Sequence, residues 1–395
     1  MSARKAAALI IVVSSSPLVC SFAAAQAPDL VFQNDVRLRF EQVGANGDTP
    51  GAEALTLRMR PSIELKASAR LSGVVELDLI SGLIDDDRNG FFTRDGRPVI
   101  PDPEGISLNR FQIDYAPTDI LTFTAGRQRL SLRNERFLGI SDFRQNQQTY
   151  DAVRGQVALK DGVTVNAGYI WQVNRFIGER RAEGQLDSES FFVAASLPSP
   201  VGTLSAFHLD LDVDSDAEVF SQSRTSGIAL DGRAFRNGVG VRWTGSLAVQ
   251  DRGGAKPAFA EIGATIDWDD VSLALRAERL GSDDGVALQT PLGTLHRFNG
   301  AADVFTTTPI DGLQDLEVKA TWRLGSLGSL RATRVSLSYN DYTPAREGPT
   351  YGREWGALAA TRIGPVKLSL AWAGYDADSF AQDIDKIWVT FSRTF

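Results

Sequence analysis

The chain has 395 residues, with 41 Lys or Arg against 49 Asp or Glu, which gives a formal net charge of −8. Hydrophobic residues make up 43% of the chain and charged residues 23%, which excludes an intrinsically disordered protein and, on bulk charge, a nucleic-acid binder. The arrangement of the apolar residues, rather than their number, therefore has to indicate the fold.

Residues 1–25 are predicted to be a secretory signal peptide. Two basic residues, Arg4 and Lys5, precede an apolar run over residues 6–13, and alanines at 23–25 stand before Gln26. The only cysteine, Cys20, lies within this segment, so the mature chain of residues 26–395 has no disulfide to stabilise it. No later run of eighteen apolar residues is present, which argues against a membrane-spanning helix.

The mature chain alternates between apolar and polar residues from one end to the other. In residues 55–66 the odd positions are mostly apolar and the even positions polar, the period of two that predicts a β-strand with one apolar face. Segments of this kind are expected to begin near residues 30, 53, 70, 106, 120, 149, 163, 189, 201, 223, 238, 257, 271, 312, 330, 352, 365 and 383. The sequence therefore predicts about eighteen strands.

The connections between these strands alternate in length. Short connections rich in Gly, Pro and Asp, such as residues 160–162 and 269–270, predict tight turns. Long polar connections lie between them, at residues 81–105, 132–148, 175–188 and 281–311. Short periplasmic turns and long extracellular loops are typical of a transmembrane antiparallel β-barrel. The first long loop is expected to cover the outer mouth, and whether it binds a metal ion is left open.

A soluble β-sandwich would also alternate, and two features favour the barrel. Ring residues recur at strand positions suited to interfacial girdles. They are Tyr169, Trp171, Trp243, Trp268, Trp322, Tyr339, Trp372 and Trp388. The last segment places Ile387, Val389, Phe391 and Phe395 at alternate positions, as outer-membrane assembly signals do. We therefore expect location in a Gram-negative outer membrane, contact with its lipid and lipopolysaccharide, and recognition by the barrel-assembly machinery through the strand ending at Phe395.

Several arginines have strand parity that places them in the lumen. The predicted pore-lining, anion-binding set is Arg37, Arg39, Arg58, Arg60, Arg110, Arg154 and Arg242. Guanidinium binds carboxylates through two parallel hydrogen bonds, which favours acidic solutes. The alternative is that these arginines only pair with inward carboxylates. The candidates are Glu41, Glu64, Glu76, Asp78, Asp114, Glu278 and Glu317.

Three stretches of the chain resemble the alginate-export family of outer-membrane barrels. They are residues 126–154, with Gly126-Arg127-Gln128 and later Asp151, residues 295–305, with Leu295-His296-Arg297, and residues 312–315. The motif residues are Arg127, Gln128, Arg136, Arg144, Asp151, His296 and Asp303. The resemblance implies an eighteen-strand monomeric barrel with an arginine-rich lumen that conducts an anionic polymer. Simple parity places Arg127 on the apolar face, so a bulge, a loop position or the upper membrane interface has to explain it.

Other function classes fit the sequence less well. A grouping of Ser205, His208 and Asp210 would be needed for a hydrolase triad, but Ser205 falls on the opposite strand face from the other two, and His208 is expected to face inward. A transporter with a folded plug and twenty-two strands needs more chain than is available. No cofactor is predicted.

The sequence thus predicts a passive outer-membrane channel for anions, either small anions or an acidic poly- or oligosaccharide such as alginate. A general porin with little charge preference is the alternative, and an outer-membrane hydrolase is a weaker one.

Overall fold

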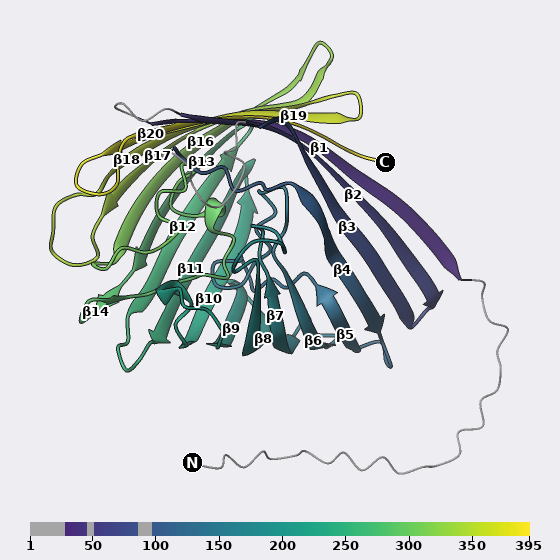
Figure 1. The fold of residues 1–395 in the computed structure, drawn as a ribbon. Coiled ribbons are helices and arrows are strands. Elements are labelled where there is room, and N and C mark those ends of the chain that lie inside the picture. The colour runs from purple at the N-terminus through teal and green to yellow at the C-terminus, as the bar shows by residue number, and fades with distance from the viewer. Residues whose placement is uncertain (1–27, 46–50, 86–96) are drawn as a thin grey trace, which may run out of the picture.

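The structure is a computed structural model, and residues 28–45, 51–85 and 97–395 are described. The predicted signal peptide lies outside these ranges. Within them, eighteen strands form one sheet in which every pairing is antiparallel, and β1 pairs with β20, so the sheet closes into a barrel (Figure 1). The all-β fold class is therefore confirmed.

The first nine strands are β1 (Asp29–Ala45), β2 (Ala52–Ser68), β3 (Leu71–Asp85), β4 (Gly105–Tyr115), β5 (Leu121–Gln128), β6 (Thr149–Ala158), β7 (Thr164–Asn174), β8 (Gln185–Ser199) and β9 (Gly202–Leu211). The other nine strands of the barrel are β10 (Ser223–Arg236), β11 (Val239–Asp251), β12 (Ala258–Trp268), β13 (Val271–Leu280), β16 (Leu313–Leu327), β17 (Leu330–Thr343), β18 (Gly352–Ile363), β19 (Val366–Ala377) and β20 (Ile384–Thr394). The loops contain a small hairpin, β14 (Ser282–Asp283) and β15 (Val286–Ala287), and the 3-10 turns η1 (Glu218–Phe220) and η2 (Leu295–Arg297).

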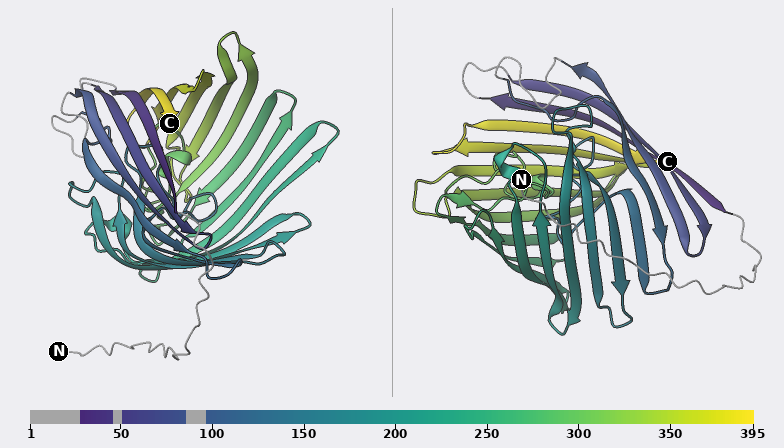
Figure 2. Two further views of the ribbon diagram at one scale, coloured as in Figure 1. Left: turned by 90° about the vertical axis from the view of Figure 1, so that its right-hand side faces the viewer. Right: turned by 60° about the horizontal axis from the view of Figure 1, so that its bottom comes forward.

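The observed strand starts agree with the alternation in the sequence. All but one lie within one residue of the expected position. The exception is β8, which starts at Gln185 rather than near 189, because only Leu186 in its first four residues signals an apolar face. The short connections gather at one rim and the long ones at the other, as Figure 2 shows.

The outer wall is apolar, as a lipid-facing surface must be. Side chains such as Ile262, Leu247 and Phe111 face outward and are more than half exposed. The ring residues expected at the interfaces also lie on outward strand positions, except Trp388. That expectation was wrong for Trp388, which is 3% exposed and faces the lumen. The lipid-facing positions of β20 are Ile387 and Val389, so Trp388 between them points to the opposite side.

The barrel closes where the two ends of the chain meet. Register pairs Arg37 of β1 with Ser392 of β20, and beyond β20 the backbone N–H of Phe395 donates to the carbonyl oxygen of Asn34 (2.9 Å). The pairing of β1 with β20 means that neither strand is left as an open edge of the sheet, which a bilayer would not tolerate. Within the described ranges, no helix has the length and apolar character needed to cross a membrane.

Candidate functional site: two loops inside an arginine-rich lumen

Two extracellular loops fold inward and meet inside the barrel. The first, residues 129–148, joins β5 to β6, and the second, residues 281–312, joins β13 to β16. The backbone N–H of Gly139 donates to the carbonyl of Leu292 (2.8 Å), and the N–H of Thr294 donates to the carbonyl of Glu135 (3.0 Å). These are the loops that carry most of the motif residues of the sequence.

An apolar cluster fixes the first loop against the wall. Leu138 is fully buried and belongs to the same cluster as Ile170 of β7. The ring of Phe137 lies 5.0 Å from that of Phe207 and 5.3 Å from that of Phe259, measured between centroids. Burial of these side chains stabilises the loop in the lumen, because each large apolar group removed from water contributes about 1.5–3 kcal/mol.

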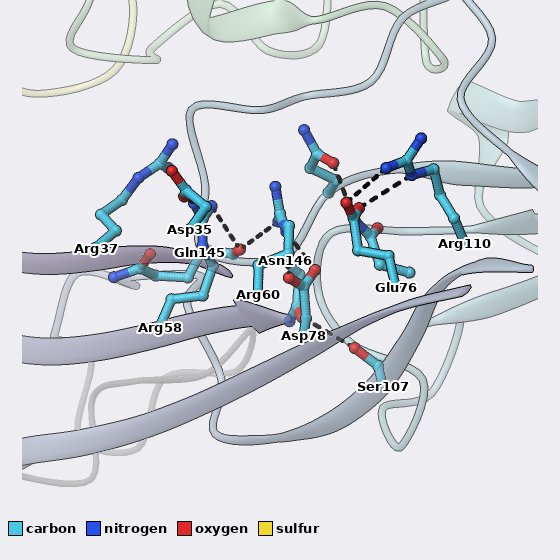
Figure 3. Close-up of polar contacts among 12 residues, drawn as sticks. Asp35, Arg37, Arg58, Arg60, Glu76, Asp78, Ser107, Arg110, Gln145 and Asn146 are labelled. Atoms are coloured by element: carbon cyan, nitrogen blue, oxygen red, sulfur yellow. Dashed lines mark hydrogen bonds and ion pairs between the residues drawn. The ribbon is translucent and has the colours of Figure 1, made fainter. Parts of the chain in front are cut away.

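Four of the predicted pore-lining arginines hold the opposite side of the same loop. Arg37 donates from Nη1 to the carbonyl oxygens of Asp142, Phe143 and Arg144 at 3.1–3.2 Å. Arg58 and Arg60 both donate to the carbonyl oxygen of Gln145, at 3.4 and 3.1 Å, and Figure 3 shows them reaching toward it from β2. Arg39 likewise donates to the carbonyl of Phe143 (2.5 Å). These guanidinium groups therefore donate hydrogen bonds to backbone carbonyl oxygens of the first loop, which has no strand partner there to donate to them.

Carboxylates neutralise part of this charge. Arg58 pairs with Asp35, and Arg60 pairs with Asp78 at 2.5 Å. On the neighbouring strands Arg110 pairs with Glu76 at 2.7 Å, which Figure 3 also shows. A register shift between β3 and β4 turns both Asn109 and Arg110 toward Glu76. This pattern matches the pairing alternative at these positions.

The other two predicted lining residues differ from each other. Arg242 lies on β11 and pairs with Asp267 at 3.0 Å, yet its side chain is 57% exposed. Arg154 occupies an inward position on β6, between Thr124 of β5 and Gly168 of β7. Among the described residues Arg154 has no hydrogen-bond or ion-pair partner, and its Nε is buried. Both therefore keep a positive charge facing the lumen.

The motif residues Arg127, Gln128 and Asp151 lie at the extracellular rim. Arg127 donates from Nε to Asp151 (2.7 Å) and also pairs with Glu179 beyond β7. Parity places Arg127 and Asp151 on the outward face, so the upper-interface explanation fits Arg127. Gln128 faces inward and donates to the carbonyl of Ala152 (2.8 Å).

The remaining motif residues join the two loops to each other and to the wall. Arg144 pairs with Glu41 of β1 at 3.0 Å and with Asp303 of the second loop at 2.9 Å. Asp303 also accepts from Nδ1 of His296 (2.8 Å), whose ring stacks on Phe143. Burial alone would raise the pKa of Asp303, but its interactions with His296, Lys386 and Arg144 lower it well below its usual range.

Arg136 makes a second link of this kind. It donates to Glu278 of β13 (2.7 Å) and to Asn299 of the second loop (2.8 Å). Burial, which disfavours the charged form, lowers its pKa. Residues of the two loops and of the wall, far apart in sequence, thus form one buried polar network. The alternation of apolar and polar residues along a strand does not predict such contacts. The family resemblance singled out Arg136, Arg144, His296 and Asp303 but not their contacts.

Sequence reasoning missed a row of cations at the short-turn rim. Register places Arg331 opposite Arg362 and Arg362 opposite Lys367, on β17, β18 and β19. All three are exposed, and in the part of the chain that the structure describes none of them has an ion-pair partner. The same row continues through Ser392 to Arg37 and Arg58. Alternation in β18 and β19 places Arg362 and Lys367 inward, whereas Arg331 reaches the same face only through the register shift between Arg331 and Arg334.

The inward carboxylates are mostly paired, in contrast to these cations. Arg276 contacts Glu278, Asp315 and Glu317, each at 3.1 Å. Arg133, which the sequence did not single out, contacts Asp231 at 2.7 Å and Glu261 at 3.1 Å. The lumen surface therefore carries more unpaired positive than unpaired negative charge among the described residues.

A polar cavity of about 740 Å³ lies on the lumen side of β9–β13. Its lining includes Arg233, Arg242 and Arg276 together with Asp231 and Glu317. Arg233 lies directly opposite Arg242, and like charges in that arrangement destabilise a strand pair.

The histidines give no catalytic arrangement of the kind considered from sequence. His208 was expected to face inward, and this was wrong: it faces outward, where its Nδ1 lies 2.8 Å from Oγ of Ser226. The neighbours Phe207 and Leu209 face inward instead and join the apolar cluster under the first loop. Ser205 lies on that inward face too, so it cannot meet His208.

Comparison with known proteins supports the fold. No protein-family model matches the chain, and no curated protein matches it in sequence. Among solved structures, Pseudomonas aeruginosa OccK9 aligns with a TM-score of 0.72 at 14% identity, over 93% of this chain and 98% of that one. Acinetobacter baumannii OccAB4 aligns at 0.71 with 11% identity, over 94% and 99%. A Pseudomonas aeruginosa OpdK structure with vanillate aligns at 0.69 with 13% identity, over 92% and 98%.

These likenesses correct one expectation. The resemblance to the alginate-export family finds no support, since no family model matches and the similar solved structures named above are Occ and Opd proteins. The eighteen-strand antiparallel barrel itself resembles the barrels of Gram-negative outer-membrane porins.

Proposed function

We propose that the protein is a passive outer-membrane channel for small solutes and that it prefers anions. The observation that carries this proposal is the charge imbalance in the lumen. Inward carboxylates such as Asp78, Glu278 and Glu317 have arginine partners, whereas Arg331, Arg362 and Lys367 have none among the described residues. Adjacent like charges on neighbouring strands cost stability, so an acidic solute would gain by contacting them.

The comparisons support a small solute rather than a polymer. The OpdK structure contains vanillate, an aromatic carboxylate, in a barrel of the same architecture. In the present chain the two lumen loops are tied to each other and to the wall by Arg136 and Arg144, which narrows the space available to a chain of sugars. We therefore propose monomeric carboxylates as the preferred cargo over an acidic polysaccharide.

Ion selectivity of the purified barrel in a planar bilayer tests this proposal. Under a KCl gradient, the reversal potential should show preference for chloride, and vanillate or benzoate should reduce the current. Substituting Arg331→Gln, Arg362→Gln and Lys367→Gln together should move the chloride-to-potassium permeability ratio toward unity. The control is Arg224→Gln with Arg353→Gln, which removes charge from the outward face and should leave the ratio unchanged.

Two outcomes would contradict the proposal. A wild-type channel without charge preference would favour the general porin, and a cation preference would exclude an anion channel. Block by oligouronates at lower concentration than by monomeric carboxylates would instead restore polysaccharide export as the function.

A further inference from the structure

The outer wall contains an apolar furrow on its lipid-facing side. It has a volume of about 700 Å³ and crosses the wall from β9 to β17, the blue-green to light-green strands of Figure 2. Strand register shows its course: Leu204 of β9 pairs with Leu230, Leu230 with Gly245, Gly245 with Ile262, and so on through Ala277 to Leu316 of β16. We call this the outer furrow. Its path follows one hydrogen-bonding row of the sheet, which climbs toward the extracellular rim because barrel strands are tilted.

Small residues create the hollow. Gly245, Ala260 and Ala277 lie on adjacent strands among larger outward side chains, and Leu247 and Ile262 beside them are each more than half exposed. A Cβ added at Gly245 would meet no atom within 4 Å, so the space above it is open. An apolar hollow in a bilayer is filled by hydrocarbon, because an empty one forfeits dispersion contacts along its whole lining.

The upper end of the furrow is polar, and the charged side chains that line it are Arg279 of β13 and Asp341 of β17, which lies opposite Leu316. Arg279 lies one residue before the extracellular end of β13 and lines the furrow with Gln314 and Thr343. Its guanidinium donates to the carbonyl oxygen of Ala345 (3.0 Å), the side chain is exposed, and no carboxylate pairs with it among the described residues. An arginine at this height faces the headgroup layer, where its other donors are free for a phosphate.

We propose that the outer furrow binds one acyl chain of a phosphorylated outer-leaflet lipid, with Arg279 binding the phosphate. The apolar part of the furrow matches the acyl chain, and Arg279 at its extracellular end matches the phosphate. The two parts follow each other along the membrane normal in the same order as in the lipid. The site is separate from the lumen, so its existence does not depend on which solute passes through the barrel.

Native mass spectrometry of the detergent-purified barrel incubated with lipid A tests this site. The wild-type barrel should retain one lipid A molecule at a detergent concentration that strips the rest. Gly245→Leu fills the furrow and should abolish that retention. Arg279→Gln should reduce it several-fold, and the reduction should vanish when the lipid is dephosphorylated.

A matched control separates filling of the furrow from a general effect of an added side chain. Gly155 of β6 also faces outward, and a Cβ there makes only ordinary contact with Phe123 at 3.5 Å, so Gly155→Leu should retain lipid as the wild type does. Heat-modifiable migration on SDS gels checks that each variant is folded. Equal retention by wild type and Gly245→Leu would overturn the proposal. A dimer that Gly245→Leu dissociates would also overturn it, because a second copy would then be the occupant.

Discussion

At the scale of single residues, the contacts in the lumen need the several hydrogen-bond donors of a guanidinium group, which the ammonium group of lysine cannot offer in the same planar arrangement. Arg37 contacts three successive carbonyl oxygens, and Arg60 serves a carboxylate and a carbonyl at once. The planar guanidinium group has five N–H donors, so it can bind several acceptors at once, and it stays charged while it does so. Most of the arginines predicted to meet a solute therefore also hold the first loop in place.

Removal of Arg144 should reveal how much the buried network stabilises the protein. Arg144→Gln leaves Glu41 and Asp303 buried without their shared cation, and we expect the free energy of unfolding to fall by about 3–5 kcal/mol. Urea unfolding in lipid vesicles measures it. Arg353→Gln is the control: its exposed pair with Asp378, at 3.8 Å, should contribute at most about 1 kcal/mol. Equal losses in the two variants would show that the network is not stabilising.

Asp303 should make this stability depend on pH. Its pKa in the folded protein lies below the value of about 3.9 for an unfolded chain, so its contribution is complete above about pH 4 and is lost as the pH falls through the folded pKa. Asp303→Asn does not titrate. The difference in unfolding free energy between wild type and Asp303→Asn should shrink as the pH falls below about 4. A difference that grows on acidification would contradict the assigned ion pairs.

At the scale of secondary-structure elements, alternation sets the strands and local irregularities adjust them. At Gly126 of β5, φ is +107°, and a Cβ would lie 2.2 Å from the carbonyl oxygen of Phe111 on β4. Only glycine suits this position, because both the backbone conformation and the close approach exclude a side chain. Next to it, Arg127 turns to Asp151 at the rim.

Substitution of Gly126 should therefore weaken the β4–β5 pairing. We expect Gly126→Ala to lower the free energy of unfolding by at least about 1–3 kcal/mol, the cost of a strained backbone conformation. The same change at Gly155, whose Cβ position makes only ordinary contacts, should have little effect. Hydrogen exchange of β4 and β5 amides measures the local opening, and unchanged protection in Gly126→Ala would show that the sheet adapts.

At the scale of the whole molecule, the wall and the lumen loops are separable. The wall is closed by backbone pairing between every neighbouring pair of strands, from β1–β2 round to β1–β20. The loops of residues 129–148 and 281–312 add side-chain contacts inside this wall. The backbone pairing of the wall is needed for the barrel to form, and the side-chain contacts of the two loops set the width of its aperture.

Replacement of the first loop should widen the channel without unfolding it. A short Gly-Ser linker in place of residues 132–146 removes the contacts of Phe137, Arg136 and Arg144, and we expect single-channel conductance to rise several-fold. Replacing the exposed residues 346–349 in the same way should leave conductance unchanged. A loop-deleted barrel that folds and conducts like the wild type would show that the aperture lies elsewhere.

The sequence by itself determined the barrel. A period of two decides which side chains face lipid, and Gly, Pro and Asp mark the turns, so the number of strands and nearly all of their starting positions followed from local chemistry. It also placed Arg37, Arg39, Arg58 and Arg60 inward. Only the tertiary structure decided what these groups contact, because the loop of residues 129–148 lacks periodicity and its contacts with these four arginines join residues 85–107 positions apart. The same holds for Trp388, which joins His296 and Phe143 in the lumen only once β20 closes the sheet.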